Sequence, residues 1–428
     1  MTFFKKESSW VSAVLAFGLI VFAVLYFQNF EYLLRGVHKI RQADTLFTGY
    51  SYCFEGTEFL KPKVANRENT SGVSIGEFPL FSYLISIPCK MTGQWSETFP
   101  RYFSIFIFLL NGLLWGAWIK KRNPQILFSS WLIFFFFCSL QLLHLSIPLP
   151  DGLALLFMGG ALFLWEEKGM HQTYFWISGL FLFGVGFLMR PYLFPLVFLY
   201  WDKKTWTAAL ALCGALYFFW YKYWIFKYSE VSYYLTRVVN PEDLVPQIPG
   251  LILPIIEISI IEMMNYVGLF LILFFVKDFK KEIAIWALVC IMVIGARGKH
   301  FINHNYYLLA GSLVISIVMT LAWNKIKNRC RTGILLLFVL IGIGLNQHLW
   351  KAPKEKWQID LERMANEKVP KDAKVASYIG VSPQWLYLSK RTGWMFKPEK
   401  YTDQCPEGAA WALILKDELP EFIPCKAQ

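Results

Sequence analysis

Three acidic side chains stand beside apolar stretches of this sequence, where a carboxylate is unusual. Asp44 lies in the run RQADT, Glu77 lies in the run GEFPL, and Asp151 directly follows the run IPLP. A carboxylate can take the proton of an attacking hydroxyl group, and carboxylates also bind divalent metals. We therefore take Asp44 as the candidate general base, and Glu77 and Asp151 as candidates for orienting a substrate or a divalent metal.

Basic side chains occur at similar places. Arg101 precedes one apolar stretch, Arg190 follows another in the run MRPY, and the run RGKHFINH contains Arg297, Lys299 and His304. Grouped cations stabilise a phosphate as it leaves, and a phosphate is stable as an anion without a general acid. One carboxylate with several cations therefore suits sugar transfer from a phosphate-linked donor, unlike the paired acids of glycoside hydrolysis. We expect Arg190, Arg297 and Lys299 to bind the phosphate, with Arg101 and His304 as further candidates.

Each of these side chains also has a simpler explanation. Asp44 could be a solvated acid or a local charge partner for Arg41. Glu77 precedes a proline at the start of an expected helix, where an acid serves as a cap. Asp151 could complement a helix dipole, which is worth ~0.3–1 kcal/mol. The two isolated arginines could extend towards lipid headgroups, and the basic run could be an ordinary loop.

The composition places these residues in a membrane protein. Of the 428 residues, 56% are hydrophobic and only 17% are charged, which is not a soluble composition. Apolar runs near the length of a membrane span recur, since a spanning helix needs ~20 mostly apolar residues. The net charge of +12 therefore indicates basic cytoplasmic loops and no nucleic-acid partner.

We expect about eleven spans, some of them too short to cross a bilayer alone. They run near Val11–Phe27, Phe103–Ile119, Ile126–Leu143, Gly152–Trp165, Tyr174–Met189, Leu193–Tyr200, Trp206–Trp224, Tyr266–Val276, Ile283–Ala296, Tyr306–Trp323 and Gly333–Leu349. The span Leu193–Tyr200 is expected to be half of a broken or re-entrant element that neighbouring helices keep from lipid.

The basic clusters in the short connections give an orientation. They are Lys5-Lys6, Lys120 to Arg122, Lys203-Lys204, Lys277 to Lys281, and Lys325 to Arg331. Under this span count they all fall on one side, which the distribution of Lys and Arg marks as the cytoplasm. The N-terminus is then cytoplasmic, and the acids, the run RGKHFINH and the C-terminal tail face outward across the cell inner membrane.

Two short helices should hold the acids of the first outer loop, residues 28–102. In Arg41–Glu55, a helical stripe of Ala43, Phe47, Tyr50 and Phe54 is suited to the bilayer interface, with Asp44 on another face. Glu77-Phe78-Pro79 should open the second helix, Leu80–Cys89.

The tail forms a second unit. Residues 1–350 are expected to form the membrane module, and residues 351–428 a small outer α+β cap. Its expected elements are a helix at Leu361–Glu367 and strands at Val375–Ile379 and Trp411–Ile414. Cysteines on the outer side can pair, and Cys405–Cys425 and Cys53–Cys89 are the pairings we expect.

These motifs resemble those of the GT-C superfamily of polytopic glycosyltransferases, near the protein O-mannosyltransferases and the lipid A aminoarabinose transferase. The matching runs are RQADT and GEFPL, Phe99-Pro100-Arg101, Leu149-Pro150-Asp151, HNYY at residues 304–307 and LYLSKRTGW at residues 386–394. The resemblance implies that Asp44 is the general base, that the donor is a polyprenyl-phosphate sugar and that transfer inverts the anomeric centre. It leaves metal dependence open, because some relatives use a divalent metal and others use none.

The resulting hypothesis is an integral-membrane hexosyl- or pentosyltransferase whose acceptor is a glycolipid, a polysaccharide or a protein. A polysaccharide polymerase or ligase would share the lipid donor but depend mainly on basic outer loops. A lipid-linked sugar flippase would predict internal repeats with broken helices at corresponding positions, and no second copy of the first-loop pattern occurs. A non-catalytic assembly factor would tolerate alanine at Asp44 and Glu77.

Overall fold

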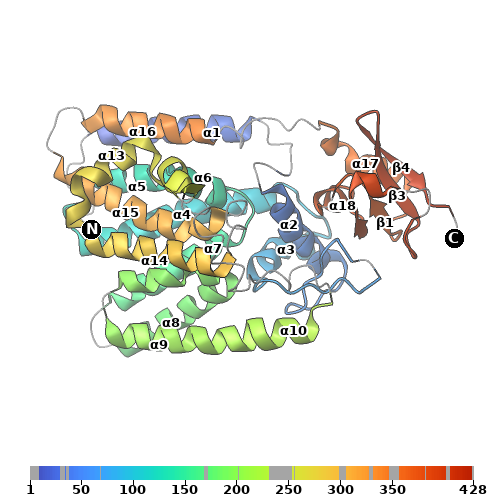
Figure 1. Ribbon diagram of the computed structural model, residues 1–428, viewed down its shortest axis with the longest axis horizontal. Helices are drawn as coiled ribbons and strands as arrows, with labels where there is room; N and C mark the ends of the chain where they lie inside the picture. Colours follow the sequence, from blue (N-terminus) through green and yellow to red (C-terminus); the bar gives the residue numbers. More distant parts are fainter. Residues whose placement is uncertain are drawn as a thin grey trace.

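The computed structural model is a bundle of apolar helices with two short helices and a small sheet domain at one end (Figure 1). It describes residues 9–28, 34, 38–67, 69–167, 172–200, 202–230, 253–254, 256–297, 305–326, 331–346, 356–380, 382–401 and 405–426. The bundle contains α1 (Ser9–Phe27), α4 (Phe99–Arg122), α5 (Phe128–Phe136), α6 (Ser139–Ser146), α7 (Asp151–Trp165), α8 (Gln172–Met189), η1 (Pro191–Leu199), α9 (Lys203–Leu216), η2 (Tyr217–Trp224), α10 (Ile225–Tyr228), η5 (Ser259–Met264), α13 (Asn265–Phe275), η6 (Val276–Asp278), α14 (Lys280–Arg297), η8 (Asn305–Leu308), α15 (Leu309–Lys325) and α16 (Arg331–Leu345).

Within the described residues, five helices are long and apolar enough to cross a membrane. They are Ser9–Phe27, Phe99–Arg122, Gln172–Met189, Lys203–Tyr228 and Ile256–Phe275. The pair α5 and α6 forms a sixth candidate, bent by 74° at its break. Three further apolar helices, Asp151–Trp165, Leu309–Lys325 and Thr332–Leu345, are shorter. The chain is therefore a multi-pass membrane protein, but the expected number of about eleven spans is not confirmed.

Two of the expected spans have a different form. Ile126–Leu143 is the bent pair α5–α6, and the span expected to begin at Tyr266 already begins at Ile256. The segment expected near Leu193–Tyr200 is the 3-10 helix η1, which carries Pro191 and Pro195, and its expected role as half of a broken or re-entrant element stays a prediction. Proline removes backbone donors, so this segment cannot continue α8 as a regular helix.

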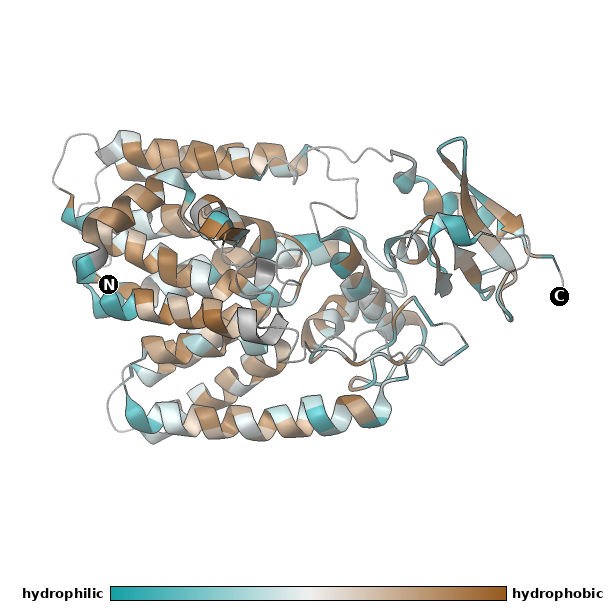
Figure 2. Cartoon of the chain, in the orientation of Figure 1, coloured by the Kyte–Doolittle hydropathy of each residue, from teal (hydrophilic) through white to brown (hydrophobic). Residues whose placement is uncertain are grey.

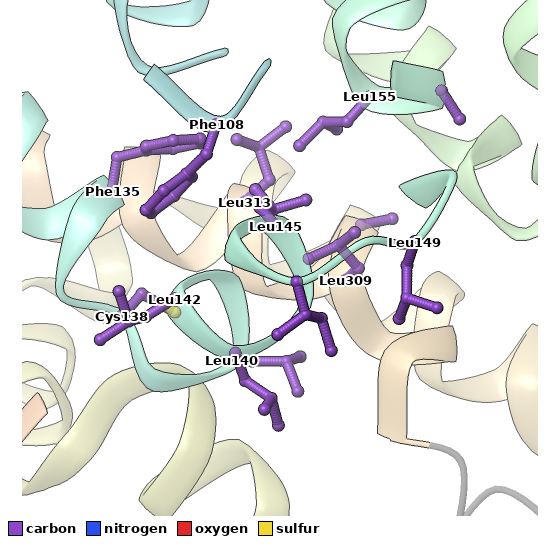
Figure 3. Packing of buried hydrophobic residues seen from close by; sticks show 14 of the residues in the cluster. Phe108, Phe135, Cys138, Leu140, Leu142, Leu145, Leu149, Leu155, Leu309 and Leu313 are labelled. Atoms are coloured by element: carbon purple, nitrogen blue, oxygen red, sulfur yellow. The ribbon is translucent and has the colours of Figure 1, made fainter. Parts of the chain in front are cut away.

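The core lies where α5 and α6 pack against α4, α7 and α15, and Figure 3 shows its leucine and phenylalanine side chains. Two buried amide side chains inside it donate hydrogen bonds between helices. Gln141 Nε2 donates to Ser316 Oγ at 3.1 Å, and Asn111 Nδ2 donates to the Gly152 carbonyl at 2.8 Å. At the break in the bent pair, a Cβ on Gly342 of α16 would lie 2.2 Å from the Phe137 carbonyl oxygen. Glycine there permits close backbone packing, which membrane helices use.

Basic side chains gather at the end of the bundle opposite α2 (Lys39–Phe54) and α3 (Leu80–Thr92). Figures 1 and 2 show that α9, α14 and α16 begin and α15 ends there. Lys121 pairs with Glu167 at 2.7 Å, and Arg122 and Lys281 line one pocket. The described basic clusters thus share one end of the bundle, as their sequence positions predict.

The two helices expected in the first loop are confirmed as α2 and α3, but one detail of the prediction is wrong. Ala43 and Phe47 are buried in the protein, at 0% and 1% exposure, and do not face a bilayer. The reason is that α2 packs against α3, where Ser82 Oγ donates to the Thr45 carbonyl at 3.0 Å. Phe54, at the end of the same stripe, remains exposed.

Beyond these helices lies the cap, whose four-stranded sheet has the order β2-β1-β3-β4. Its elements are η10 (Lys356–Ile359), α17 (Leu361–Lys368), β1 (Val375–Ser377), α18 (Gln384–Leu388), β2 (Gly393–Met395), η11 (Pro398–Lys400), β3 (Trp411–Lys416) and β4 (Leu419–Pro424). Strand β1 is parallel to β2 and β3, and β3 is antiparallel to β4, with Trp411 opposite Pro424. The expected helix and two strands are therefore confirmed, and β2 and β4 are additions.

Both expected disulfides are present. Cys53–Cys89 joins α2 to the end of α3 with a Cα–Cα distance of 5.9 Å, and Cys405–Cys425 closes the cap at 5.6 Å. The first bond therefore restrains the two helices that carry and flank Asp44.

Replacing Cys53 and Cys89 together by alanine should lower the free energy of unfolding of the outer loop by roughly 3–4 kcal/mol. This figure follows from the loop-closure entropy of a separation of 36 residues. Hydrogen exchange of α2 and α3 peptides measures the effect, and exchange should rise in both helices. The matched control, alanine at Cys405 and Cys425, should raise exchange in β4 and leave α3 unchanged. Unchanged exchange of α3 in the first variant would contradict the prediction.

Candidate active site

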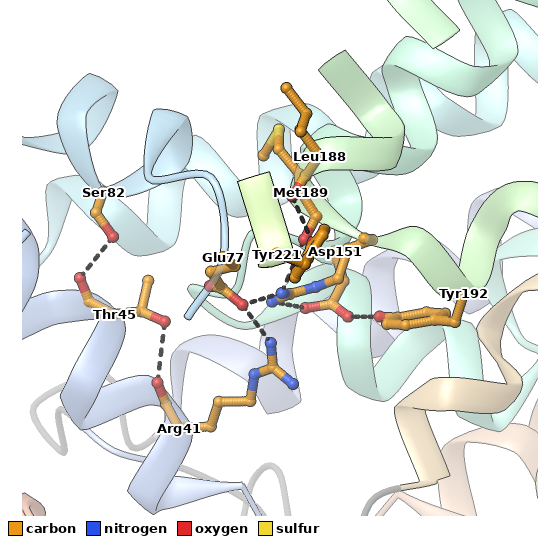
Figure 4. Close-up of polar contacts among 10 residues, drawn as sticks. Arg41, Thr45, Glu77, Ser82, Asp151, Leu188, Met189, Tyr192 and Tyr221 are labelled. Atoms are coloured by element: carbon orange, nitrogen blue, oxygen red, sulfur yellow. Dashed lines mark hydrogen bonds and ion pairs between the residues drawn. The ribbon is translucent and has the colours of Figure 1, made fainter. Parts of the chain in front are cut away.

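Four charged side chains from distant parts of the sequence meet at the end of the bundle next to α2 and α3, and Figure 4 shows their contacts as dashed lines. Arg41 comes from the first turn of α2, Glu77 from the segment before α3, Asp151 from the start of α7, and Arg190 from the residue after α8. Two positive and two negative charges thus form one network, and three of its members are residues that the sequence singles out.

The inner half of the network is buried. The Asp151 side chain is 0% exposed and the Arg190 side chain 3% exposed, with Arg190 Nη2 2.9 Å from Asp151 Oδ2. The Tyr192 hydroxyl donates a hydrogen bond to the other carboxylate oxygen of Asp151. Isolated charges are very costly away from water, so this close pairing is what permits their burial.

The outer half of the network is partly open to solvent. Glu77 Oε2 accepts a hydrogen bond from Arg41 Nη2 at 2.8 Å and a second one from Arg190. The side chains of Arg41 and Glu77 are 20% and 33% exposed. A substrate that approaches the network from outside would therefore meet Arg41 and Glu77 before the buried pair.

The local sequence explains how these side chains are placed. Pro191 ends α8, because the residue before a proline is disfavoured in the helical region, and Arg190 adopts φ −147° and ψ 86°. The Leu188 carbonyl just before this turn accepts hydrogen bonds from the Phe78 backbone N–H at 3.3 Å and from the Tyr221 hydroxyl at 2.9 Å. The segment carrying Glu77 is thereby attached to the end of α8, beside Arg190.

Asp44 lies one helical turn after Arg41 on α2 and is partly exposed. Residues three apart in a helix lie on the same side, so Asp44 is on the side of α2 that carries Arg41. The next residue, Thr45, donates its hydroxyl to the Arg41 carbonyl at 2.9 Å and accepts the bond from Ser82 described above. Arg41, the charge partner considered for Asp44, contacts Glu77.

The other cations predicted from the sequence are Arg101, Arg297, Lys299 and His304, and the structure describes the side chain of Arg101 alone. Arg101 is in the first turn of α4 and is 2% exposed, so it points into the protein and does not extend towards headgroups. Arg297 is the last residue of α14, and the placement of its side chain lies outside the described part of the structure. Lys299 and His304 also lie outside the described residues.

Within the described part of the chain, no three His, Cys, Asp or Glu side chains come together as metal ligands. Glu77 and Asp151 both bind Arg190, so their oxygens here hold a guanidinium group. A divalent metal on Glu77 Oε2 or on Asp151 Oδ2 would have to replace an arginine contact.

Two members of this site are absent from the sequence-based prediction. The sequence indicates Arg41 only as a partner for Asp44, and it does not single out Tyr192, which follows Arg190 and Pro191 directly. Its only signal in the sequence is a tyrosine hydroxyl in an otherwise apolar segment, since a buried tyrosine hydroxyl usually finds a partner.

Neither a protein family model nor a curated protein sequence matches the chain. Its structure matches eight solved chains. Among them are crystal structures of ArnT from Cupriavidus metallidurans in the apo state and bound to undecaprenyl phosphate. Both are 11% identical to this chain with a TM-score of 0.59, and the match covers 96% of this chain and 93% or 94% of ArnT. The chain therefore has the fold of these ArnT structures, over nearly the whole length of both chains.

Proposed function

We propose that this protein, which has the fold of the GT-C transferase ArnT, transfers a sugar from a polyprenyl-phosphate donor to a hydroxyl group outside the inner membrane. The supporting observation is the charged network at the end of the bundle, together with a fold that in ArnT has been crystallised with undecaprenyl phosphate. The acceptor is a glycolipid, polysaccharide or protein. In this proposal the basic end of the bundle is cytoplasmic, and α2, α3 and the cap face outward.

The proposed reaction needs one proton transfer and one displacement. The Asp44 carboxylate takes the proton of the acceptor hydroxyl while the hydroxyl oxygen forms a bond to the anomeric carbon of the sugar. The bond between that carbon and the phosphate oxygen breaks, and the polyprenyl phosphate leaves as an anion. Attack opposite the leaving group inverts the anomeric centre.

The phosphate is proposed to bind to Arg190, Arg297 and Lys299, with Arg101 and His304 as further ligands. The buried Nε atom of Arg190 has no hydrogen-bond partner among the described residues, so not every donor of this cation is used by the network. Arg41 adds a partly exposed cation beside Glu77. Glu77 and Asp151 fix the direction of Arg190 and orient the sugar, and of these two carboxylates Glu77 is the one that an incoming substrate reaches.

Titration of the purified protein in nanodiscs with undecaprenyl phosphate tests this proposal. We expect saturable binding that weakens about 10-fold in Arg297→Ala and in Lys299→Ala, because each variant loses a charge-assisted contact to phosphate. Lys280→Ala, which removes an exposed lysine at the other end of α14, is the matched control and should bind like the wild type. Absence of saturable binding by the wild-type protein would count decisively against a polyprenyl-phosphate donor.

A further inference from the structure

The run LYLSKRTGW in the cap has an unusual backbone where it faces the first outer loop. Lys390 adopts a positive φ of 52°, which is uncommon for a residue other than glycine, asparagine or aspartate. Gly393 has a φ of 152°, and a Cβ there would lie 2.0 Å from the Val375 carbonyl oxygen. Strained backbone of this kind persists only where surrounding contacts hold it, and it is frequent at functional sites.

The Lys390 side chain leaves the cap and contacts the segment before α4. It pairs with Glu97, and the two side chains are 5% and 21% exposed. The Tyr387 hydroxyl donates to the other oxygen of the same carboxylate. Burial raises the pKa of Tyr387 well above its ordinary value, and Glu97 raises it further, so this hydroxyl remains a donor. A nearly buried lysine therefore ties the cap to the outer loop through an acid 293 positions away.

The same lysine also contacts α2. Its Nζ lies 3.7 Å from the centre of the Tyr387 ring and 5.7 Å from the centre of the Tyr50 ring. The Tyr50 ring in turn meets Trp95 edge to face at 6.0 Å, two residues before Glu97. Tyr50 lies six residues after Asp44, which is about 9 Å along a helix axis.

A second contact joins Gly393 to α2 through the loop after that helix. The Gly393 N–H donates to the Ala65 carbonyl at 3.1 Å, and its carbonyl accepts from the Arg67 N–H at 2.9 Å. Arg67 Nη2 then binds both oxygens of Glu55, at 2.7 and 2.6 Å, just after the end of α2. The cap thus contacts the C-terminal half of α2 at two places, through Lys390 at Tyr50 and through Gly393 and Arg67 at Glu55.

Arg391, the residue after Lys390, makes its contacts within the cap. Arg391 is 1% exposed and donates to the carbonyl oxygens of Ala365 and Val369, at 3.2 and 2.6 Å, inside the cap. The fold of the cap therefore depends on Arg391, while the Lys390 ammonium group reaches Glu97 and Tyr50 outside the cap. Removing the Lys390 ammonium group should leave the cap folded.

We propose that Lys390 is a positioning residue: its contacts with Glu97 and Tyr50 fix the orientation of α2, and hence of the Asp44 carboxylate. The effect on Asp44 rests on the proposed transferase function, whereas the effect on α2 does not. Catalytic groups must be held in a narrow range of positions, so loss of this restraint lowers the rate more than it lowers donor affinity.

The test compares Lys390→Met with Lys371→Met, which removes an exposed lysine elsewhere in the cap. In Lys390→Met, hydrogen exchange of α2 should rise at least 10-fold, kcat should fall at least 10-fold, and KM for the donor should stay within about 2-fold. Lys371→Met should match the wild type. The exchanged pair Glu97→Lys/Lys390→Glu should recover at least a third of the lost kcat and most of the protection of α2.

The two readouts separate the two proposals. Unchanged exchange of α2 in Lys390→Met would overturn the positioning role, whatever the activity. Raised exchange in α2 and in the cap alike would also overturn it, because the variant would then have unfolded the cap. Hydrogen exchange of Lys390→Met that rises in α2 alone would support the restraint on α2. If the wild-type protein also transferred no sugar, the proposed transferase function would be overturned and the restraint would still stand.

Discussion

Asp44→Asn should lower the rate of sugar transfer about 10²- to 10⁴-fold, the usual contribution of a general base. Asparagine has nearly the same shape as aspartate but cannot take the acceptor proton. The donor phosphate is assigned to cations, so affinity for undecaprenyl phosphate should change less than about 3-fold. The measurement is transfer of labelled sugar from a polyprenyl-phosphate donor by the purified variant, with donor binding titrated on the same sample.

Glu58→Gln is the matched control for this experiment. Glu58 belongs to the same outer loop, its side chain is 69% exposed, and it pairs with Lys61. The Glu58→Gln variant should transfer sugar at the wild-type rate, since an exposed ion pair contributes little to stability. Near wild-type activity of Asp44→Asn would remove Asp44 from the role of base, and Glu77 would become the carboxylate to replace next.

The sequence predicts the outer-loop helices and both disulfides because these depend on local patterns and on compartment. Helical periodicity placed α2 at Arg41–Glu55, and the structure has it at Lys39–Phe54. The same pattern could not show what covers the apolar stripe. Phe47 in α2 and a lipid-facing residue have the same hydrophobicity, and only the docking of α3 and the cap decides between them.

The charged network shows a similar limit. Three of its four members could be selected singly as acids or cations beside apolar stretches. Their pairing joins Glu77 to Arg190 and Arg190 to Asp151, across separations of 113 and 39 residues. No local pattern encodes such a contact. Strand β4 was missed for a different reason: Pro420 and Pro424 argue against a strand, and they are tolerated because β4 is at the edge of the sheet.

Arg190→Gln should destabilise the protein by about 3–5 kcal/mol, because it leaves the buried Asp151 carboxylate without its partner. It should also reduce transfer strongly, since Glu77 loses one of its two arginines. Unfolding in detergent and transfer of labelled sugar measure the two effects. Lys325→Gln is the control: it breaks the exposed pair with Asp278, whose side chains are 45% and 47% exposed, and should cost less than about 1 kcal/mol.

The double variant Arg190→Gln/Asp151→Asn separates folding from chemistry. It replaces the ion pair by two neutral amides that can bond to each other, and the asparagine oxygen still accepts from the Tyr192 hydroxyl. Most of the lost stability should return, because no uncompensated charge remains buried. Transfer should remain low, since neither Glu77 nor a donor phosphate has regained a cation at residue 190. If the double variant regained both stability and transfer, the pair of Arg190 and Asp151 would serve folding alone. If it regained neither, the claim that the two buried charges stabilise the fold by balancing each other would be wrong.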